Sequence, residues 1–284
     1  MLDSRISIGI KTLLRDGKLF RSLADIRRNM PEMKIIVADD GEQNEEKDGV
    51  YADLIREGHK VIILPFDSGF GKKSNAIIAA LDTEFLLISS DDFNHGPPSV
   101  KVGIEKMLAV LDRNPGLSIV SGRLANRGPY EFYLEEKDGV IREVPAPSVA
   151  EFFMLPLDFD YLPCDVTVNY SLIRRNVFWT EGWVTNVDGP YWEEKRTQIG
   201  FDDEEIIGEG GHGAFFYDVK KAGLKVGWVP GVEISEQTGR DSDRYRQFRA
   251  RAHGPSRKCF GKRGIKKWIL GSGQIDYDVT GEQK

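Results

Sequence analysis

The stretch from residue 66 to residue 95, FDSGFGKKSNAIIAALDTEFLLISSDDFNH, constrains the fold of this chain more than any other. It predicts a glycine-containing loop, a short helix over 74–81 and a buried strand over 85–88. Asp91 and Asp92 follow this strand directly, so they lie at the carboxyl end of a strand, where open α/β sheets bind ligands. Two carboxylates in this position suit a hard divalent cation, and such a cation suits a diphosphate.

Two glycines in the same stretch, Gly69 and Gly71, are expected to let the backbone approach a ligand closely, with Lys72 and Lys73 adding positive charge beside them. The stretch is not a P-loop, because that motif needs a Ser or Thr directly after its lysine and another glycine upstream. It also differs from a dinucleotide-binding fingerprint, which has a third glycine where Ser74 stands. The glycines and lysines therefore predict an anion-binding turn that is neither a P-loop nor a dinucleotide-binding fingerprint.

Strands and helices alternate along the first part of the chain. Unbroken apolar runs predict strands, and apolar residues at helical spacing predict helices. The expected strands are 6–10, 33–38, 59–64, 85–88 and 117–121, and the expected helices are 16–29, 42–57, 74–81 and 98–113. This alternation predicts a parallel sheet with right-handed crossovers and flanking helices.

The second half of the chain is less regular. Asp138-Gly139, between apolar runs over 130–136 and 140–144, is a strong signal for a hairpin. The remaining expectations are a strand over 166–168, a helix over 172–179, a loop-rich region over 185–211, a helix over 215–222 that ends at Gly223, and a strand over 225–229.

Composition places the chain among soluble globular proteins, with 284 residues, 40% of them hydrophobic and 30% charged. Cys164 and Cys259 are far apart and are expected to be free thiols in a reducing compartment. The sequence shows neither a signal peptide nor an apolar run long enough to span a bilayer, so a cytoplasmic location is expected. The net charge of −6 speaks against a general nucleic-acid binder, although residues 240–267 are strongly basic.

Three segments resemble glycosyltransferases of the GT-A fold in their order and spacing: ISIGIKTLLR, IIVADDGE and GFGKKSNAIIAALDTEFLLISSDDF. They look like the inverting family 2, and in particular the β-1,4-N-acetylgalactosaminyltransferase group, which carries similar "KTFLR", "IADD" and "DDDF" stretches. The resemblance continues more loosely through GGHGAFF and KKAGLKVGWVP. It implies a GT-A, Rossmann-like α/β fold in a single fused domain, with a mostly parallel central sheet, a nucleotide-sugar-binding half over 1–123 and an acceptor-binding half over 124–284.

The resemblance also implies a reaction. A sugar would move from a nucleotide-sugar donor, with a UDP-sugar expected, to a hydroxyl of a glycan or another acceptor, with Mn²⁺ or Mg²⁺ as cofactor. In an inverting single displacement no enzyme nucleophile is required, but a general base must take the proton of the acceptor hydroxyl.

Donor-binding roles carry over residue by residue. The nucleoside would be held by Thr12, Asp39 and Asp40, at the ends of the first two strands. Asn75 matches the "RN" of the family, but Ser74 stands in place of its arginine, and Lys72 or Lys73 would replace that charge. The diphosphate contacts expected from the basic tail are Arg249, Lys258 and Lys262.

The DxD motif of the family becomes Ser90-Asp91-Asp92. Asp92 is the expected metal ligand, Asp91 is expected to face the ribose or the metal, and Glu236 occupies about the position of a further ligand. Because the first carboxylate of the motif is replaced by Ser90, metal dependence is less firmly implied. Adjacent aspartates at the end of a strand are also common turn formers.

The general base is where the chain departs from the family, which has an acidic pair before the helix that ends in KKAG. His212 is preferred narrowly over Glu209. The outer candidates are Asp202, Asp203, Glu204 and Glu205. The GEGGHG run also fits a flexible lid, in which His212 would be a solvated loop residue.

The aromatic and basic residues of the second half allow more than one interpretation. Trp183, Tyr191 and Trp192 suit either a sugar-stacking platform or a core. The basic tail suits a solvated helix face, a diphosphate contact, a peripheral contact with an acidic membrane surface, or nucleic acid. The alternatives to a glycan-modifying enzyme are therefore a non-catalytic GT-A-like protein that binds nucleotide or glycan, and a transferase acting on a modified nucleic-acid base.

Overall fold

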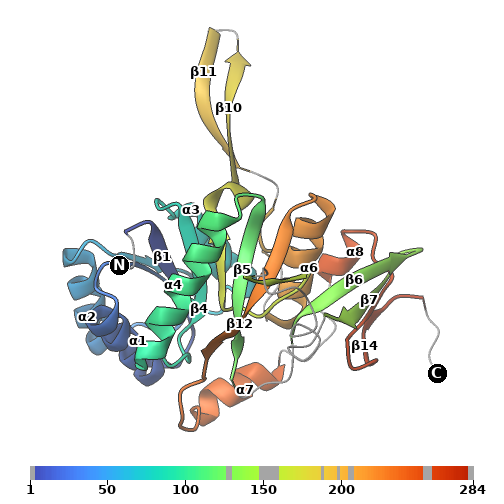
Figure 1. Ribbon diagram of the computed structural model, residues 1–284. Helices are drawn as coiled ribbons and strands as arrows, with labels where there is room; N and C mark the ends of the chain where they lie inside the picture. The colour runs from blue at the N-terminus through green and yellow to red at the C-terminus, as the bar shows by residue number, and fades with distance from the viewer. Residues whose placement is uncertain are drawn as a thin grey trace.

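A computed structural model of the protein has a large mixed α/β body with a central sheet (Figure 1). The structure describes residues 4–125, 130–146, 160–186, 189–196, 199–203, 208–251 and 258–280. Among the described strands, eight form the central sheet in the order β3-β2-β1-β4-β9-β5-β12-β8. Their bounds are β1 Ile6–Thr12, β2 Lys34–Asp39, β3 Lys60–Ile63, β4 Phe85–Ser90, β5 Leu117–Leu124, β8 Leu162–Cys164, β9 Ser171–Arg174 and β12 Lys225–Ile234.

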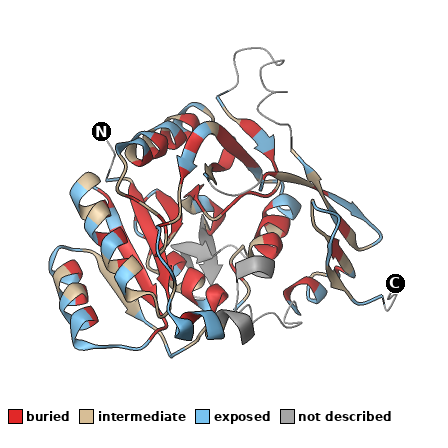
Figure 2. Ribbon diagram, turned by 90° about the horizontal axis from the view of Figure 1, so that it is seen from below, coloured by how far each residue is buried: buried red, intermediate tan, exposed pale blue. Residues whose placement is uncertain are grey.

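The central sheet is buried on both faces, as the apolar strands predict. In β2, Ile35 and Val37 belong to the cluster packed against helices α1 (Asp16–Asn29), α2 (Glu45–Arg56) and α4 (Pro98–Arg113). Ile36 and Ala38, on the opposite face, belong to the cluster that contains side chains of α3 (Phe70–Ala79) and α6 (Gly208–Lys221). Buried residues accordingly run through the middle of the molecule (Figure 2).

The strand directions confirm the prediction of a mostly parallel sheet. Strands β3, β2, β1 and β4 are parallel to one another, and β12 is parallel to β5. Strand β9 is antiparallel to both β4 and β5, and β8 is antiparallel to β12. The chain leaves β1 toward β2 and β3 and then returns to β4 on the other side of β1. This reversal makes the carboxyl ends of β1 and β4 a topological switch point, where a ligand crevice is expected.

Two smaller sheets accompany the central one. Strands β14 (Ile275–Asp278), β13 (Lys267–Ile269), β7 (Val140–Pro145) and β6 (Phe132–Lys137) form a sheet in that order. The turn between β6 and β7 has Asp138 at φ 55° and Gly139 at φ 82°, as expected for a two-residue hairpin loop. Strands β10 (Trp179–Asn186) and β11 (Gly189–Arg196) form a hairpin that projects from the body (Figure 1).

Several predictions for the second half are wrong. Residues 172–179 are not a helix: they contain most of β9, a 3₁₀ turn over Arg175–Val177 and the start of β10. Leu172 and Ile173 are both fully buried because β9 lies inside the sheet, and periodicity alone cannot distinguish such a short apolar run from a buried helix. The strand expected over 166–168 is reduced to a single bridge between Val166 and Phe132.

The region over 185–211 is also more regular than predicted. It contains the end of β10, all of β11 and the start of α6, so the glycine-rich run before Phe215 is helical and is not a lid loop. Packing overrides the low helix propensity of glycine here. A Cβ on Gly213 would lie 3.2 Å from the indole of Trp268, so the missing side chain allows α6 to pack closely against that ring.

Gly71 has a different role from the predicted ligand contact. Helix α3 begins at Phe70, with Gly69 at its N-cap at φ 95°, so Gly71 lies in the first turn. A Cβ on Gly71 would lie 1.8 Å from the carbonyl oxygen of Asp202. The glycine therefore admits the backbone of another loop.

We expect Gly71→Ala to lower the free energy of unfolding by about 1 to 3 kcal/mol, because the Asp202 backbone has to move. Gly49→Ala is the matched control, since Gly49 lies in helix α2 with nothing within 4 Å of the added Cβ. That change should raise the free energy of unfolding by up to about 1 kcal/mol. Chemical denaturation measures both, and changes of the same sign would contradict the packing role of Gly71.

Candidate active site

A cavity of about 450 Å³ lies at the carboxyl ends of β1 and β4. At its first end, charged and polar side chains from β1, the β1–α1 turn, α3 and the end of β4 face the space: Lys11, Thr12, Arg15, Lys73, Ser90 and Asp92. The sequence predicted a site at this edge, and the structure brings Thr12, Lys73 and the Asp91–Asp92 pair together there.

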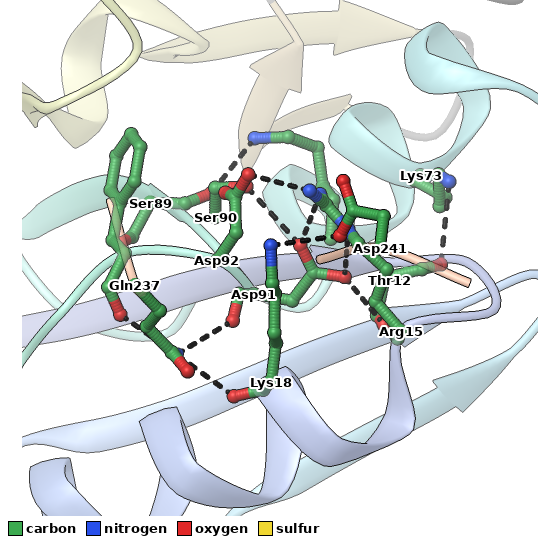
Figure 3. A network of polar contacts seen from close by, with 12 residues as sticks. Thr12, Arg15, Lys18, Lys73, Ser89, Ser90, Asp91, Asp92, Gln237 and Asp241 are labelled. Atoms are coloured by element: carbon green, nitrogen blue, oxygen red, sulfur yellow. Dashed lines mark hydrogen bonds and ion pairs between the residues drawn. The ribbon is translucent and has the colours of Figure 1, made fainter. Parts of the chain in front are cut away.

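The Asp91–Asp92 pair is held by residues at the ends of β1 and β4 (Figure 3). Asp91 is fully buried and accepts a hydrogen bond from the Thr12 hydroxyl at 2.8 Å. Arg15 donates to both carboxylates, from Nε to Asp91 Oδ2 at 3.2 Å and from Nη1 to Asp92 Oδ2 at 2.5 Å, and its Nη2 also pairs with Asp91 Oδ1. Ser90 donates to Asp92 Oδ1 at 2.6 Å.

The pKa values of the two aspartates shift in opposite directions. Burial raises the pKa of Asp91, although the guanidinium of Arg15 works in the other direction. Asp92 is less buried, so Arg15 and the Ser90 hydroxyl outweigh the effect of burial and lower its pKa. The same carboxylates raise the pKa of Arg15 against the effect of burial, so Arg15 carries a permanent positive charge.

Sequence reasoning missed Arg15, although it lies in the ISIGIKTLLR segment that carried the resemblance. The turn that presents it is strained, since Leu14 has φ 56°, a left-handed value that is costly for a leucine. Arg15 is the N-cap of α1, and its guanidinium lies 4.5 Å from the ring centroid of Tyr245. The arginine is therefore fixed between the aspartates and a ring.

Lys73 and Lys11 supply two further cations. Lys73 Nζ donates to Asp40 Oδ1 at 2.6 Å and to the Thr12 carbonyl at 3.3 Å. Asp40 also accepts from the Gly69 amide at 3.0 Å, so its predicted contact with the nucleoside is at most indirect in this arrangement. Lys11 donates to the Ser89 carbonyl, and burial, with Lys73 nearby, lowers its pKa to about 7.

Asp39 is fully buried and engaged in internal contacts. Its carboxylate accepts from the Gly41 amide at 2.8 Å, the Tyr51 hydroxyl at 2.8 Å and Gln43, and it pairs with Lys47 at 3.0 Å. These contacts fix the loop between β2 and α2. The carboxylate is not among the described groups that line the cavity.

Glu236 and Gln237, after β12, approach the aspartate pair. Glu236 forms a backbone bridge with Phe93 and lines the cavity. Gln237 binds the backbone of the Asp91–Phe93 turn through both its backbone and its side chain. Its backbone N–H donates to the Asp92 carbonyl at 2.6 Å, and its side-chain Nε2 donates to the Asp91 and Phe93 carbonyls. Sequence reasoning missed Gln237, which positions the pair.

The remaining donor-binding predictions do not converge on the cavity within the described part of the chain. Lys72 is exposed, and the Asn75 carboxamide holds the 201–203 segment through the Phe201 backbone and Asp203. Lys262 pairs with Asp202 at 3.1 Å, and Lys258 is exposed. The side chains of Arg249 and Glu209 lie outside the described residues, as do Glu204 and Glu205.

The basic tail and strand β13 contribute rings to the cavity. Tyr245 and Phe248 of α7 (Asp243–Arg251) line it, and so do Phe260 of α8 (Lys258–Gly261) and Trp268 of β13. Phe260 and Trp268 are stacked with centroids 4.7 Å apart. Many tail cations are instead paired with carboxylates: Arg244 with Glu42, Arg263 with Asp218 and Lys267 with Asp278.

The second end of the cavity is thus aromatic, with two carboxylates. Phe132, Phe260 and Trp268 line it beside Glu143 and Asp276. Glu143 accepts from the Trp268 indole at 2.9 Å and from the Gly271 amide at 3.0 Å. Burial raises the pKa of Glu143, which brings this carboxyl closer to the range of a proton acceptor.

His212 lies on the wall between the two ends. Its ring is 4.6 Å from the Phe70 centroid and 6.2 Å from that of Phe201. Burial, together with the positive charge of Lys11, lowers the pKa of His212 to about 3. The imidazole is therefore neutral at pH 7, with a lone pair on one ring nitrogen, but it is a weak base.

Solved structures decide the fold. S. aureus TarS, residues 1–349, matches with a TM-score of 0.52 and 14% identity, over 82% of this chain and 60% of that chain. The same protein in complex with UDP-GlcNAc matches with a TM-score of 0.52 and 14% identity, over 84% of this chain and 60% of that chain. This is a GT-A fold. The fold predicted from the sequence is thereby confirmed.

Curated relatives agree with the resemblance seen in the sequence. The chain is 28% identical over 238 residues to mouse β-1,4 N-acetylgalactosaminyltransferase 2. The aligned region covers 82% of this chain and 39% of that protein. The chain is 26% identical over 226 residues to mouse β-1,4 N-acetylgalactosaminyltransferase 1, covering 76% and 36%. No protein-family model matches. The chain thus spans about two fifths or less of the length of these relatives.

The described residues of the GT-A domain include no group of three or more His, Cys, Asp or Glu side chains that could hold a metal ion. All four oxygens of Asp91 and Asp92 accept hydrogen bonds from Arg15, Thr12 or Ser90. In this arrangement the oxygens of Asp91 and Asp92 do not fit a divalent cation, because they could coordinate one only after Arg15 and the two hydroxyls have moved. None of the described helices is both long enough and apolar enough to cross a membrane.

Proposed function

We propose that this GT-A domain binds a nucleotide sugar, with a UDP-sugar as the expected donor, and transfers the sugar to a hydroxyl of a glycan. The observation that carries the proposal is the cavity itself, which joins a cationic end at β1 and β4 to an aromatic, acidic end at β13. The first end suits a diphosphate and the second suits a sugar, which presents both hydroxyls and apolar C–H faces.

The cationic end accounts for the leaving group. Glycosyl transfer builds negative charge on the departing diphosphate, and fixed cations in a cavity that excludes water stabilise such charge strongly. Lys11, Lys73 and Arg15 line this end. Further support comes from TarS, which has been solved in complex with UDP and with UDP-GlcNAc.

The acceptor would enter from the aromatic end and attack the sugar from the side opposite the diphosphate. This geometry is that of an inverting single displacement, in which a base removes the proton of the acceptor hydroxyl. His212 lines the cavity between the two ends and is neutral at pH 7, so it stays our proposed base, with Glu209 as the alternative from the same helix. The metal dependence expected from the sequence also stays a prediction.

A second candidate function is nucleotide or glycan binding without turnover. Two observations favour it: the low basicity of His212 and the engagement of both aspartates by Arg15. Either would weaken chemistry while leaving the cavity able to bind a ligand.

Release of UDP from UDP-sugars, measured with a panel of glycan acceptors, separates the two functions. We expect turnover that falls at least about a hundredfold in Asp92→Asn, because the Asp92 carboxylate holds the Arg15 guanidinium at the leaving-group end of the cavity. Asp48→Asn, an exposed change on α2, is the matched control and should leave turnover unchanged. Binding of a UDP-sugar without UDP release would favour the binding protein, and an α-linked product from an α-linked donor would contradict inversion.

A further inference from the structure

Arg15 occupies the place between Asp91 and Asp92 where a cation would be expected. Its guanidinium contacts both carboxylates, and Thr12 and Ser90 complete the set of donors around the four oxygens (Figure 3). An arginine fork matches carboxylate geometry well, and such charge-assisted pairs are strong where water is excluded. Here the side chain of Asp91 is fully buried and those of Arg15 and Asp92 are only 13% and 16% exposed.

The surroundings hold Arg15 in this position. The ring of Tyr245, a buried residue of α7, lies 4.5 Å from the guanidinium carbon. The adjacent acid Asp241 is paired with Lys18 at 2.8 Å, and Leu14 adopts its left-handed conformation directly before Arg15. Contacts from α7 and from the β1–α1 turn thus converge on one side chain. These contacts indicate that the side chain of Arg15 is preorganised in this position.

We propose that Arg15 is the resident cation of the Asp91–Asp92 pair and competes with a divalent ion for it. The inference rests on the proposed function for its choice of ligand, a nucleoside diphosphate. Without ligand, Arg15 neutralises a buried carboxylate that would otherwise lie uncompensated in the protein. A metal ion that binds alone must displace the guanidinium from both of its carboxylate partners, which makes that exchange unfavourable.

A diphosphate changes this balance. Its oxygens offer Arg15 an alternative bidentate partner, as phosphate groups do for arginine in general. Transfer of the guanidinium to the diphosphate would leave the carboxylates of Asp91 and Asp92 able to hold a divalent ion, which would help to neutralise the diphosphate. Arg15 would thereby couple nucleotide binding to metal binding.

Titration of Mn²⁺ in the absence of nucleotide tests the competition, with free Mn²⁺ measured by electron paramagnetic resonance. We expect Arg15→Gln to bind one Mn²⁺ at least about tenfold more tightly than the wild type, because the carboxylates are released. Arg21→Gln, an exposed change on the same helix, is the matched control and should behave as the wild type. Equal Mn²⁺ affinity of the wild type and Arg15→Gln would overturn the proposal, and so would the absence of Mn²⁺ binding in Arg15→Gln.

Thermal unfolding gives a second readout that does not depend on catalysis. Mn²⁺ should raise the Tm of Arg15→Gln and leave that of the wild type unchanged. If Arg15→Gln does not fold, Arg15→Lys replaces it, because lysine keeps the charge but cannot hold two carboxylates with one planar fork. These titrations contain no nucleotide, so failure of UDP to bind would count against the proposed function alone.

Discussion

Replacing Lys73 by methionine is expected to lower the free energy of unfolding by about 3 to 5 kcal/mol. Lys73 and Asp40 are both buried, and their charged atoms are 2.6 Å apart. Removing the lysine leaves the Asp40 carboxylate in the protein interior with the Gly69 amide as its remaining donor in the described contacts. Burial already raises the pKa of Asp40, so the carboxylate relies on Lys73 to stay charged.

The neighbouring residue provides the control. Lys72 is exposed and lies in the same turn of α3, so Lys72→Met should change the free energy of unfolding by less than about 0.5 kcal/mol. Adding Asp40→Asn to Lys73→Met should restore part of the loss, because both members of the ion pair are then uncharged. Chemical denaturation of the three variants measures these differences. Similar unfolding free energies for Lys72→Met and Lys73→Met would contradict the buried ion pair.

The affinity for UDP is expected to fall as the pH rises above 7, with a slope that approaches tenfold per pH unit, and to lie about thirtyfold below its low-pH value by about pH 8.5. The reason is Lys11, whose pKa is lowered to about 7 by burial and by Lys73. A bound diphosphate favours the charged amine and raises its pKa, so binding takes up a proton wherever the free protein has lost it. Affinity is therefore greatest below pH 7 and is lost as the pH rises through the pKa of the free protein.

Lys11→Arg is the control for this titration, because arginine stays charged throughout the range. Calorimetry of UDP binding at several pH values, in buffers with different ionisation enthalpies, reports both the affinity and the proton uptake. The variant should bind with little dependence on pH and take up no proton. If the affinity for UDP depended on pH equally in Lys11→Arg and in the wild type, a group other than Lys11 would be responsible for the titration.

The first half of the fold was predictable because each of its elements carries a local signal. Strands such as β2 contain an unbroken apolar run, here IIVA over 35–38, because they are buried on both faces, and α4 begins at Pro98, where the missing amide costs nothing. The second half was not, because its elements depend on packing. Strand β9 enters between β4 and β5, and the glycine-rich start of α6 is helical against Trp268.

The candidate site divides in the same way. Asp91 and Asp92 were predictable, because a carboxylate pair at a strand end is a local pattern. Arg15 was not, because its partner Asp91 is 76 residues away and the sequence does not show which carboxylate an arginine meets. The same holds for Gln237, which lies 146 residues from Asp91. The "KTLLR" segment was the available signal, since it places Arg15 shortly after Thr12, between the end of β1 and the start of α1.

Calorimetric titration with UDP, GDP, ADP and CDP, in the presence of Mn²⁺, tests most directly whether the cavity is a nucleotide-sugar site. We predict binding of one nucleoside diphosphate per chain, with UDP preferred, and a loss of affinity of at least about tenfold in Lys11→Met but not in Lys72→Met. Absence of binding by all four nucleotides, or equal binding by the Lys11→Met variant, would contradict this prediction.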